Sequence, residues 1–311
     1  MKIAILIPYF GKWPEWINLY LFSCGRNKDV DWFFFTDCPV PRDVGENLHF
    51  YEMSFQDYCE NVSNKLEIDF RPENPYKLCG LRPFYGYIHQ ELIEGYDFWG
   101  WGDVDVIWGD IKSFYPDELL GKYDVFSTQA DRLSGHLTII RNERKYVDLA
   151  FRIKDWQEKL LSDRLWALDE VDYARLLYPQ SWYIQKFYAR IIRKIFNWRD
   201  AWVIYNKLLP VLNACFFIKK RKLFFKEQYT TPILYNDGLI FKHDSDSWIY
   251  KDGKMWNAKN KREYIYLHFM IFKKNIFRTD HFWDKGCNKI ADGYDLDKGF
   301  LINRQGFLPV V

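Results

Sequence analysis

The chain has 311 residues, of which 48% are hydrophobic, so it is long and apolar enough to bury a substantial core. Its 44 basic and 42 acidic side chains give a net charge of +2, which argues against a uniformly basic nucleic-acid binder. The six cysteines form no C-x-x-C pair of the kind that builds zinc or redox sites, and they fit a reducing compartment. No apolar run approaches the ~20 residues that cross a bilayer. We therefore expect a cytoplasmic protein without a membrane span or a nucleic-acid partner.

The start of the chain predicts alternating strands and helices. Residues 3–8 form a continuous apolar run that ends in a proline, as buried parallel strands do, and residues 32–37 repeat the pattern. Residues 16–24 between them have helical apolar spacing, which completes a βαβ unit. Ligands of open α/β sheets bind beyond the carboxyl ends of the strands. Residues 8–10 and 36–37 are therefore expected on one rim of the sheet.

The following segments continue the α/β pattern. A turn at residues 74–77 leads into residues 78–93, which look helical despite Pro83. An apolar run over residues 96–102 predicts a strand, and residues 123–128 and 136–141 predict two more. Residues 1–145 are thus predicted to form one α/β nucleotide-binding domain.

The second half of the chain differs from the first in composition and in the spacing of its apolar residues. Residues 146–230 are rich in Trp, Leu, Lys and Arg and mostly helical in spacing. Within them, residues 190–226 carry ten basic side chains against one acidic side chain, Asp200. Such a stretch can lie on an anionic membrane surface, and a solvated basic face is the alternative. Residues 231–311 alternate aromatic and polar residues, which predicts short strands and loops.

Paired aspartates recur in the chain. The D-x-D tripeptides are Asp29/Asp31, Asp103/Asp105, Asp244/Asp246 and Asp295/Asp297. Only Asp103/Asp105 ends a strongly apolar strand. Carboxylate oxygens suit Mg²⁺ or Mn²⁺, and such ions usually complete their coordination with substrate phosphates. We therefore expect a divalent metal between these carboxylates and a diphosphate; two acids that only cap a strand end are the alternative.

Three segments resemble a family of bacterial GT-A-type glycosyltransferases in polysaccharide gene clusters: NPYKLCGLRP at residues 74–83, YDFWGWGDVDVIWGD at 96–110 and GHLTIIRN at 135–142. The resemblance covers roughly the first half of the chain. It implies a GT-A-like, Rossmann-like sheet flanked by helices over residues 1–145. A basic and aromatic helical lobe over 146–230 would follow, and residues 231–311 would pack back on the active site.

The resemblance also implies roles for individual residues. The residues expected to hold a UDP-sugar are Pro8, Tyr9, Phe10, Thr36, Asp37, Lys77, Arg82, Asp103, His136 and Lys273. Asp103, Asp105 and His268 are expected to hold Mn²⁺ or Mg²⁺. Asp169 and Glu170 stand where related enzymes carry an acidic pair facing the acceptor, and one of them would take the acceptor proton if the reaction inverts the anomeric centre. A structural role in the core, at a helix end or on a solvated face is the alternative for each residue.

The implied activity is transfer of a hexose, with galactose as the expected sugar, from a UDP-sugar to a saccharide or lipid-linked saccharide acceptor. The setting would be capsule or O-antigen assembly at the inner face of the cytoplasmic membrane. A metal-dependent nucleotidyltransferase, which also uses paired carboxylates, is one alternative. A non-catalytic glycan-binding protein, which the 20% aromatic content would suit, is the other. No G-x-x-x-x-G-K-[ST], G-x-S-x-G or H-E-x-x-H motif is present, which argues against P-loop, serine-hydrolase and zinc-protease chemistry.

Overall fold

The computed structural model describes most of the first two hundred residues and much of the C-terminal part. The described residues are 1–42, 44–128, 133–177, 179–197, 200, 204, 223–225, 247–273, 283 and 287–310, without the side chains of 179–185, 223–225, 271 and 273. The Asp244/Asp246 pair and the basic residues 219–222 therefore lie outside the description. Within the described residues, no helix is both long and apolar enough to cross a membrane.

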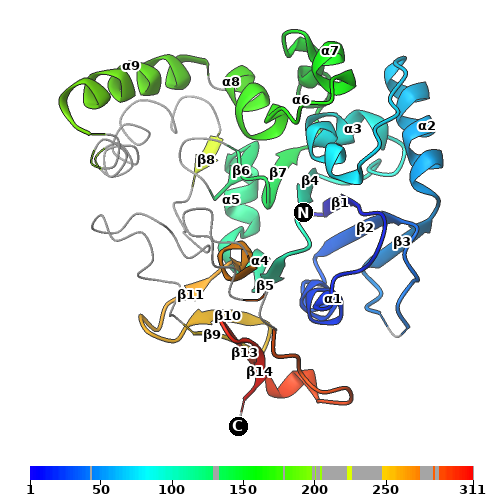
Figure 1. The fold of residues 1–311 in the computed structure, drawn as a ribbon, viewed down its shortest axis with the longest axis vertical. Coiled ribbons are helices and arrows are strands. Elements are labelled where there is room, and N and C mark those ends of the chain that lie inside the picture. The colour runs from blue at the N-terminus through cyan, green and yellow to red at the C-terminus, as the bar shows by residue number, and fades with distance from the viewer. Residues whose placement is uncertain are drawn as a thin grey trace.

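The described residues form a mixed α/β fold around a seven-stranded sheet with the strand order β3-β2-β1-β4-β7-β6-β8 (Figure 1). Neighbouring strands from β3 to β4 run parallel, β7 is antiparallel to both of its neighbours, and β8 is parallel to β6. The strands of this sheet are β1 (Ile3–Pro8), β2 (Val30–Thr36), β3 (Leu48–Glu52), β4 (Phe98–Gly102), β6 (Val125–Ser127), β7 (Leu137–Arg141) and β8 (Leu223–Phe225).

Two smaller sheets contain the C-terminal strands. One pairs β5 (Val106–Trp108) with β12 (Tyr266–His268), and the other has the order β11-β10-β9-β13-β14. The strands of the five-stranded sheet are β9 (Trp248–Lys251), β10 (Lys254–Asn257), β11 (Glu263–Tyr264), β13 (Phe300–Asn303) and β14 (Gly306–Pro309). Figure 1 shows this sheet below β5, at the opposite end of the molecule from α7 and α9.

Most of the helices are short. The α-helices of the described residues are α1 (Ile17–Gly25), α2 (Phe55–Leu66), α3 (Tyr85–Ile88), α4 (Ile111–Phe114), α5 (Asp117–Lys122), α6 (Arg144–Val147), α7 (Trp156–Leu161), α8 (Ala174–Leu177), α9 (Pro179–Ile195) and α11 (Met270–Lys273). The 3₁₀ or π turns are η1 (Pro75–Phe84), η2 (Asp148–Arg152), η3 (Leu168–Tyr173) and η5 (Leu296–Lys298).

Apolar side chains on both faces of the central sheet explain its position between two helical layers. On β1, Ala4 and Leu6 pack with α2, η1 and α3, whereas Ile3, Ile5 and Ile7 pack with α1, β5 and β12. Successive side chains of a strand point to opposite faces, so a continuous apolar run fills both layers. The sequence prediction of a buried parallel strand at residues 3–8 is therefore confirmed.

Several other predicted elements are also confirmed. α1, β2, β4, β6 and β7 lie where helical spacing or apolar runs predicted them. Residues 78–93 form no continuous α-helix: η1 is a 3₁₀ turn that contains Pro83, and α3 follows it. Proline lacks the N–H that an α-helix interior requires, which favours the shorter turns.

Among its described residues, the region predicted to be mostly helical includes one strand of the central sheet. β8 lies within residues 146–230 and pairs with β6. The prediction missed β3 and α2, although α2 begins with a capping box in which Ser54 and Asp57 bond each other's backbone N–H groups. The division into 1–145, 146–230 and 231–311 stays a prediction.

A buried histidine makes the fold sensitive to acid. The His89 ring stacks on Phe35 with 4.2 Å between ring centroids, and its Nε2 lies 3.0 Å from the Tyr58 hydroxyl. Burial lowers the pKa of His89 from 6.5 to about 3. Between these values the unfolded chain binds a proton at this site that the folded chain does not, so stability falls as the pH falls.

We expect this histidine to contribute a slope of about 1.4 kcal/mol per pH unit to the free energy of unfolding below pH 6.5. Replacing both partners, in a Tyr58→Phe/His89→Phe variant, removes the titrating ring without leaving the hydroxyl unpaired. Urea unfolding of both proteins from pH 7 to pH 4 measures the difference. Equal slopes would contradict the assignment.

Candidate functional site

The predicted metal-binding aspartates lie at the point where the sheet reverses its strand order. The chain passes from β1 to β2 on one side and returns to β4 on the other side of β1. Because these strands are parallel, their carboxyl ends share one edge, and ligands of such sheets bind in the crevice at the switch point. Asp103 and Asp105 follow β4 at this edge, and Tyr9 follows β1.

Two hydrogen bonds to the backbone hold the Asp103–Asp105 turn. The indole N–H of Trp16, the residue before α1, donates to the carbonyl oxygen of Val104 at 2.8 Å. The backbone N–H of Phe269 donates to the carbonyl oxygen of Asp105 at 3.2 Å. The sequence prediction did not single out Trp16, because nothing in its local pattern points to a partner 88 residues away.

The C-terminal part of the chain reaches the turn through β12. His268 lies opposite Val106 in the antiparallel β5–β12 pair. The Gly109 N–H donates to the carbonyl oxygen of Ile265 at 2.8 Å, and a Cβ on Gly109 would lie 2.7 Å from the carbonyl oxygen of Tyr264. Glycine therefore permits the close approach that brings His268 beside Asp105.

Three potential ligand atoms meet at this place. One atom each from Asp103, His136 and His268 lies within 4.8 Å of the other two. The two imidazole rings stack with 4.4 Å between centroids, and both side chains are buried. His268 Nε2 lies 3.3 Å from Asp105 Oδ1, so Asp105 can orient the ring. The structure thus brings the predicted donor-site residue His136 into the group that includes Asp103 and His268.

The donor set fits a divalent transition metal. A carboxylate with two imidazoles suits borderline cations, whereas Mg²⁺ prefers oxygen donors. Among the described residues, Arg82 forms ion pairs with two of the nearby carboxylates, those of Asp103 and Asp169.

Arg82 connects the aspartate turn to the predicted acidic pair. Its Nη1 donates to Asp169 Oδ2 at 2.8 Å, and its Nη2 donates to Asp103 Oδ1. Burial alone would lower the pKa of Arg82. The nearby carboxylates of Asp103 and Asp169 raise this pKa by more than burial lowers it, so the net pKa lies well above its usual value and the guanidinium stays charged. Burial raises the pKa of Asp103, and Arg82 partly offsets this rise.

The acidic pair begins η3 and packs against Gly135. Asp169 is buried, whereas Glu170 is half-buried. A Cβ on Gly135 would lie 2.9 Å from both Arg82 Nη1 and Glu170 Oε1. A glycine before His136 therefore leaves room for the guanidinium and the glutamate together.

Other residues predicted to bind the donor have structural partners. Lys77 Nζ donates to the carbonyl oxygens of Lys159 and Arg164, at 3.3 and 2.5 Å, so the structure ties it to the segment around the end of α7. Phe10 is a core residue that packs against Phe55 and Tyr58. The side chain of Lys273 lies outside the described residues.

The rim after β1 and β2 is held by polar contacts. Asp37 Oδ1 accepts a 2.7 Å hydrogen bond from the N–H of Gly11, and the buried Thr36 hydroxyl accepts one from Cys38. Gly11 has φ +107°, a conformation that favours glycine. Thr36 and Asp37 therefore shape the loop that follows Pro8, at the end of β1.

A stacked aromatic pair lies on the same rim. The rings of Tyr9 and Trp13 are 4.9 Å apart with an interplanar angle of 15°, and the Trp13 indole N–H donates to the carbonyl oxygen of Pro39. Burial, together with the nearby Cys38 and Asp105, raises the pKa of Tyr9. The sequence prediction included Tyr9 but missed Trp13, whose place in a Gly-Lys-Trp-Pro turn after the first strand was an available signal.

Removing the charge of Arg82 is expected to destabilise the fold. In Arg82→Met the half-buried Asp103 and the buried Asp169 lose their shared partner, which costs about 3 kcal/mol of unfolding free energy. The matched control is Arg71→Met, because Arg71 pairs with Asp69 on the surface with both side chains at least 75% exposed. Urea unfolding at neutral pH measures both. An Arg82→Met variant as stable as Arg71→Met would show that the ion pairs of Arg82 with Asp103 and Asp169 do not stabilise the fold.

Comparison with known proteins gives a family without an assigned activity. A search of the curated proteins finds no match. A family model described as a family of unknown function, DUF6625, matches residues 5–293, a range that includes every site residue discussed above. Because the match spans most of the chain, the protein belongs to the DUF6625 family.

Proposed function

We propose that this protein is a metal-dependent glycosyltransferase of GT-A type that transfers a hexose from a UDP-sugar to a saccharide or lipid-linked saccharide. The observation that carries the proposal is the meeting of Asp103, His136 and His268 at the switch point of the sheet. A cation held there would lie where open α/β sheets bind their ligands. A nucleoside diphosphate offers such a cation the phosphate oxygens it needs.

The rim provides complementary groups for the rest of the donor. The Tyr9–Trp13 pair offers aromatic surface for the base, and the loop fixed by Asp37 and Gly11 lies beside it. Asp103, His136 and His268 would hold the ion, with Asp105 orienting His268. When bound, the ion supplies Lewis-acid stabilisation of the charge on the departing diphosphate. The two imidazoles favour Mn²⁺ over Mg²⁺.

The chain's own charged residues would position the reactants. Asp169, buried and bonded to Arg82, holds the guanidinium beside Asp103 and is a positioning residue in this proposal. Glu170, half-buried next to it, is the candidate to face the acceptor. If the anomeric centre inverts, Glu170 takes the proton of the acceptor hydroxyl; if it is retained, the pair holds the sugars in place. Surface-polysaccharide assembly is the proposed setting, and UDP-galactose is the first donor to test.

Loss of a metal ligand is expected to remove activity. Asp103→Asn and His268→Gln should each lower Mn²⁺-dependent UDP release from UDP-galactose by at least about a hundredfold. Calorimetry should show weaker Mn²⁺ binding in both. The matched control is Asp297→Asn. Asp297 belongs to another D-x-D tripeptide, and it forms an ion pair with Arg26 away from the candidate metal site.

The same assay separates the alternatives. Release of pyrophosphate from a nucleoside triphosphate would favour a nucleotidyltransferase. Saccharide binding that ignores both UDP and Mn²⁺, with no turnover, would favour a glycan-binding protein. Turnover at the native rate in Asp103→Asn would exclude the proposed metal site.

We also propose that the protein docks on an anionic membrane through α9. Phe187, Ile191 and Ile195 repeat every four residues and are 61%, 38% and 67% exposed. No acidic residue lies between Asp172 and Asp200 in the sequence, whereas exposed basic side chains such as Arg190 and Lys194 adjoin the apolar row. An exposed apolar stripe flanked by basic residues suits the surface of an anionic bilayer.

Vesicle sedimentation tests this docking surface. A Phe187→Ser/Ile191→Ser/Ile195→Ser variant is expected to lose binding to vesicles that contain phosphatidylglycerol, because the buried apolar area is lost. The control is Leu161→Ser/Leu165→Ser, which removes two exposed apolar side chains elsewhere. Binding that survives the α9 changes would contradict the proposal.

A further inference from the structure

The outer face of the five-stranded sheet carries a basic, aromatic surface. Side chains alternate along β9 and β10, so Tyr250 and Met255 are buried in the C-terminal core. Ile249 and Trp256, which lie opposite each other in the register, are only partly buried on the other face. An aromatic ring is therefore available to a ligand on this face.

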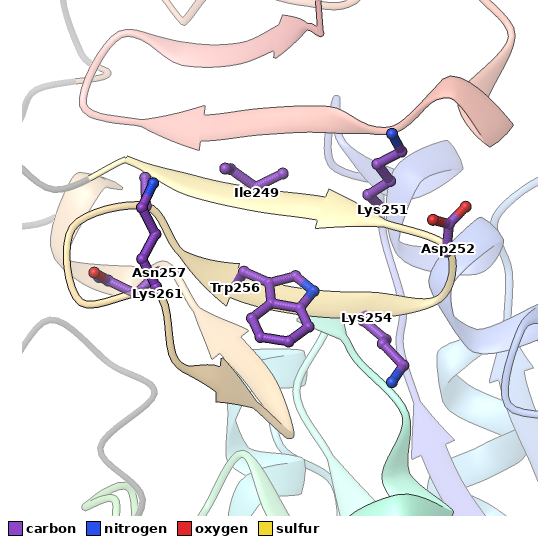
Figure 2. A pocket seen from close by; sticks show the side chains of 8 residues that line it. Ile249, Lys251, Asp252, Lys254, Trp256, Asn257 and Lys261 are labelled. Atoms are coloured by element: carbon purple, nitrogen blue, oxygen red, sulfur yellow. The ribbon is translucent and has the colours of Figure 1, made fainter.

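A hollow of about 400 Å³ lies over these strands. Its lining includes Ile249, Lys251, Lys254, Trp256, Asn257 and Lys261. In the view of Figure 2, the Trp256 ring lies between Lys254 on one side and Lys261 on the other. This volume is at the lower end of the range found for small-molecule sites.

Two turns fix the edges of the hollow. Asp252 and Gly253 have φ of 51° and 73°, the left-handed pair that a two-residue hairpin between β9 and β10 requires. Asn257 Oδ1 accepts hydrogen bonds from the N–H groups of Lys259 and Asn260, each at 3.0 Å, and so holds the turn that leads to Lys261. The lysines therefore project from an ordered frame, which lowers the entropy lost when a ligand binds.

The local charge favours an anion. Residues 249–263 contain five basic side chains and two acidic ones, Asp252 and Glu263. Lys254 lies 3.5 Å from Glu263, whereas Lys251 and Lys261 are exposed. The surface thus combines excess positive charge with a flat apolar ring.

We propose that this hollow is a binding site for an acidic saccharide, such as a uronic acid unit of a glycan, separate from the Asp103 group. The apolar face of the sugar ring would pack on Trp256, and its carboxylate would be attracted by the exposed lysines at the two ends of the hollow, Lys251 and Lys261. A single aromatic ring suits one sugar better than a nucleic-acid strand, which needs successive stacking surfaces along a basic track.

The position of the site gives it a role in the proposed transferase. β11 of the same sheet precedes β12, which carries His268, and a Cβ on Gly109 after β5 would lie 2.7 Å from the carbonyl oxygen of Tyr264 and 3.1 Å from the backbone nitrogen of Met255. A glycan bound to the five-stranded sheet would therefore be held by the same C-terminal part of the chain that positions His268. This role rests on the proposed function, but the binding itself does not.

Calorimetry with a short oligogalacturonate tests the site. The native protein should bind this probe at low salt and bind an uncharged cello-oligosaccharide of equal length at least about tenfold more weakly. Trp256→Ala and Lys251→Gln/Lys261→Gln should each weaken oligogalacturonate binding by about five- to tenfold. The control, Lys298→Gln, changes an exposed lysine outside the hollow and should bind normally.

The outcomes separate this proposal from the proposed activity. Oligogalacturonate binding should persist in Asp103→Asn and in the presence of EDTA, whereas the proposed function predicts that this variant loses transfer. Equal binding of the uncharged probe, or unchanged binding in both the tryptophan and the lysine variants, would overturn the site. So would loss of binding in Asp103→Asn, full competition by inorganic phosphate, or tighter binding of oligouridylate.

Discussion

The arrangement of the candidate site depends on the short antiparallel pair between β5 and β12. This pair brings residues 266–268 to the segment that follows Asp105, with His268 opposite Val106. The backbone N–H of Phe269 then bonds the carbonyl oxygen of Asp105 itself. Three residue pairs are few, but they are buried among Trp108 and Tyr266, so water does not compete for their hydrogen bonds. This pairing therefore places His268 beside Asp105.

Arg82 balances the charge of two carboxylates beside this strand pair. Its guanidinium is shared by Asp103 and Asp169, which stand on different segments and would repel each other if brought together alone. Gly135 leaves the space that this arrangement needs. The bridge therefore joins the strand edge, the 3₁₀ turn and the acidic pair into one charged unit beside His136 and His268.

Local sequence patterns were enough to predict much of the central sheet and the position of the Asp103/Asp105 pair after an apolar strand, whereas its role stays a prediction. The apolar runs of β1, β2 and β4 fill cores on both faces, and such runs are visible without a partner. β8 was missed because a three-residue strand is defined by its pairing with β6, which no local pattern encodes. Trp16 and the approach of His136 to His268 depend on contacts between distant segments, so sequence spacing could not reveal them. Lys77 carries the right charge to bind a phosphate, but its ammonium group donates hydrogen bonds to backbone carbonyl groups near the end of α7.

The order of the ligands along the chain has a consequence for biosynthesis. Asp103 and His136 leave the ribosome well before His268, which lies 132 residues after His136 (268 − 136). A nascent or truncated polypeptide therefore carries an incomplete ligand set, even after its first strands have folded. The three side chains can therefore meet only after residue 268 has been synthesised and β12 has paired with β5.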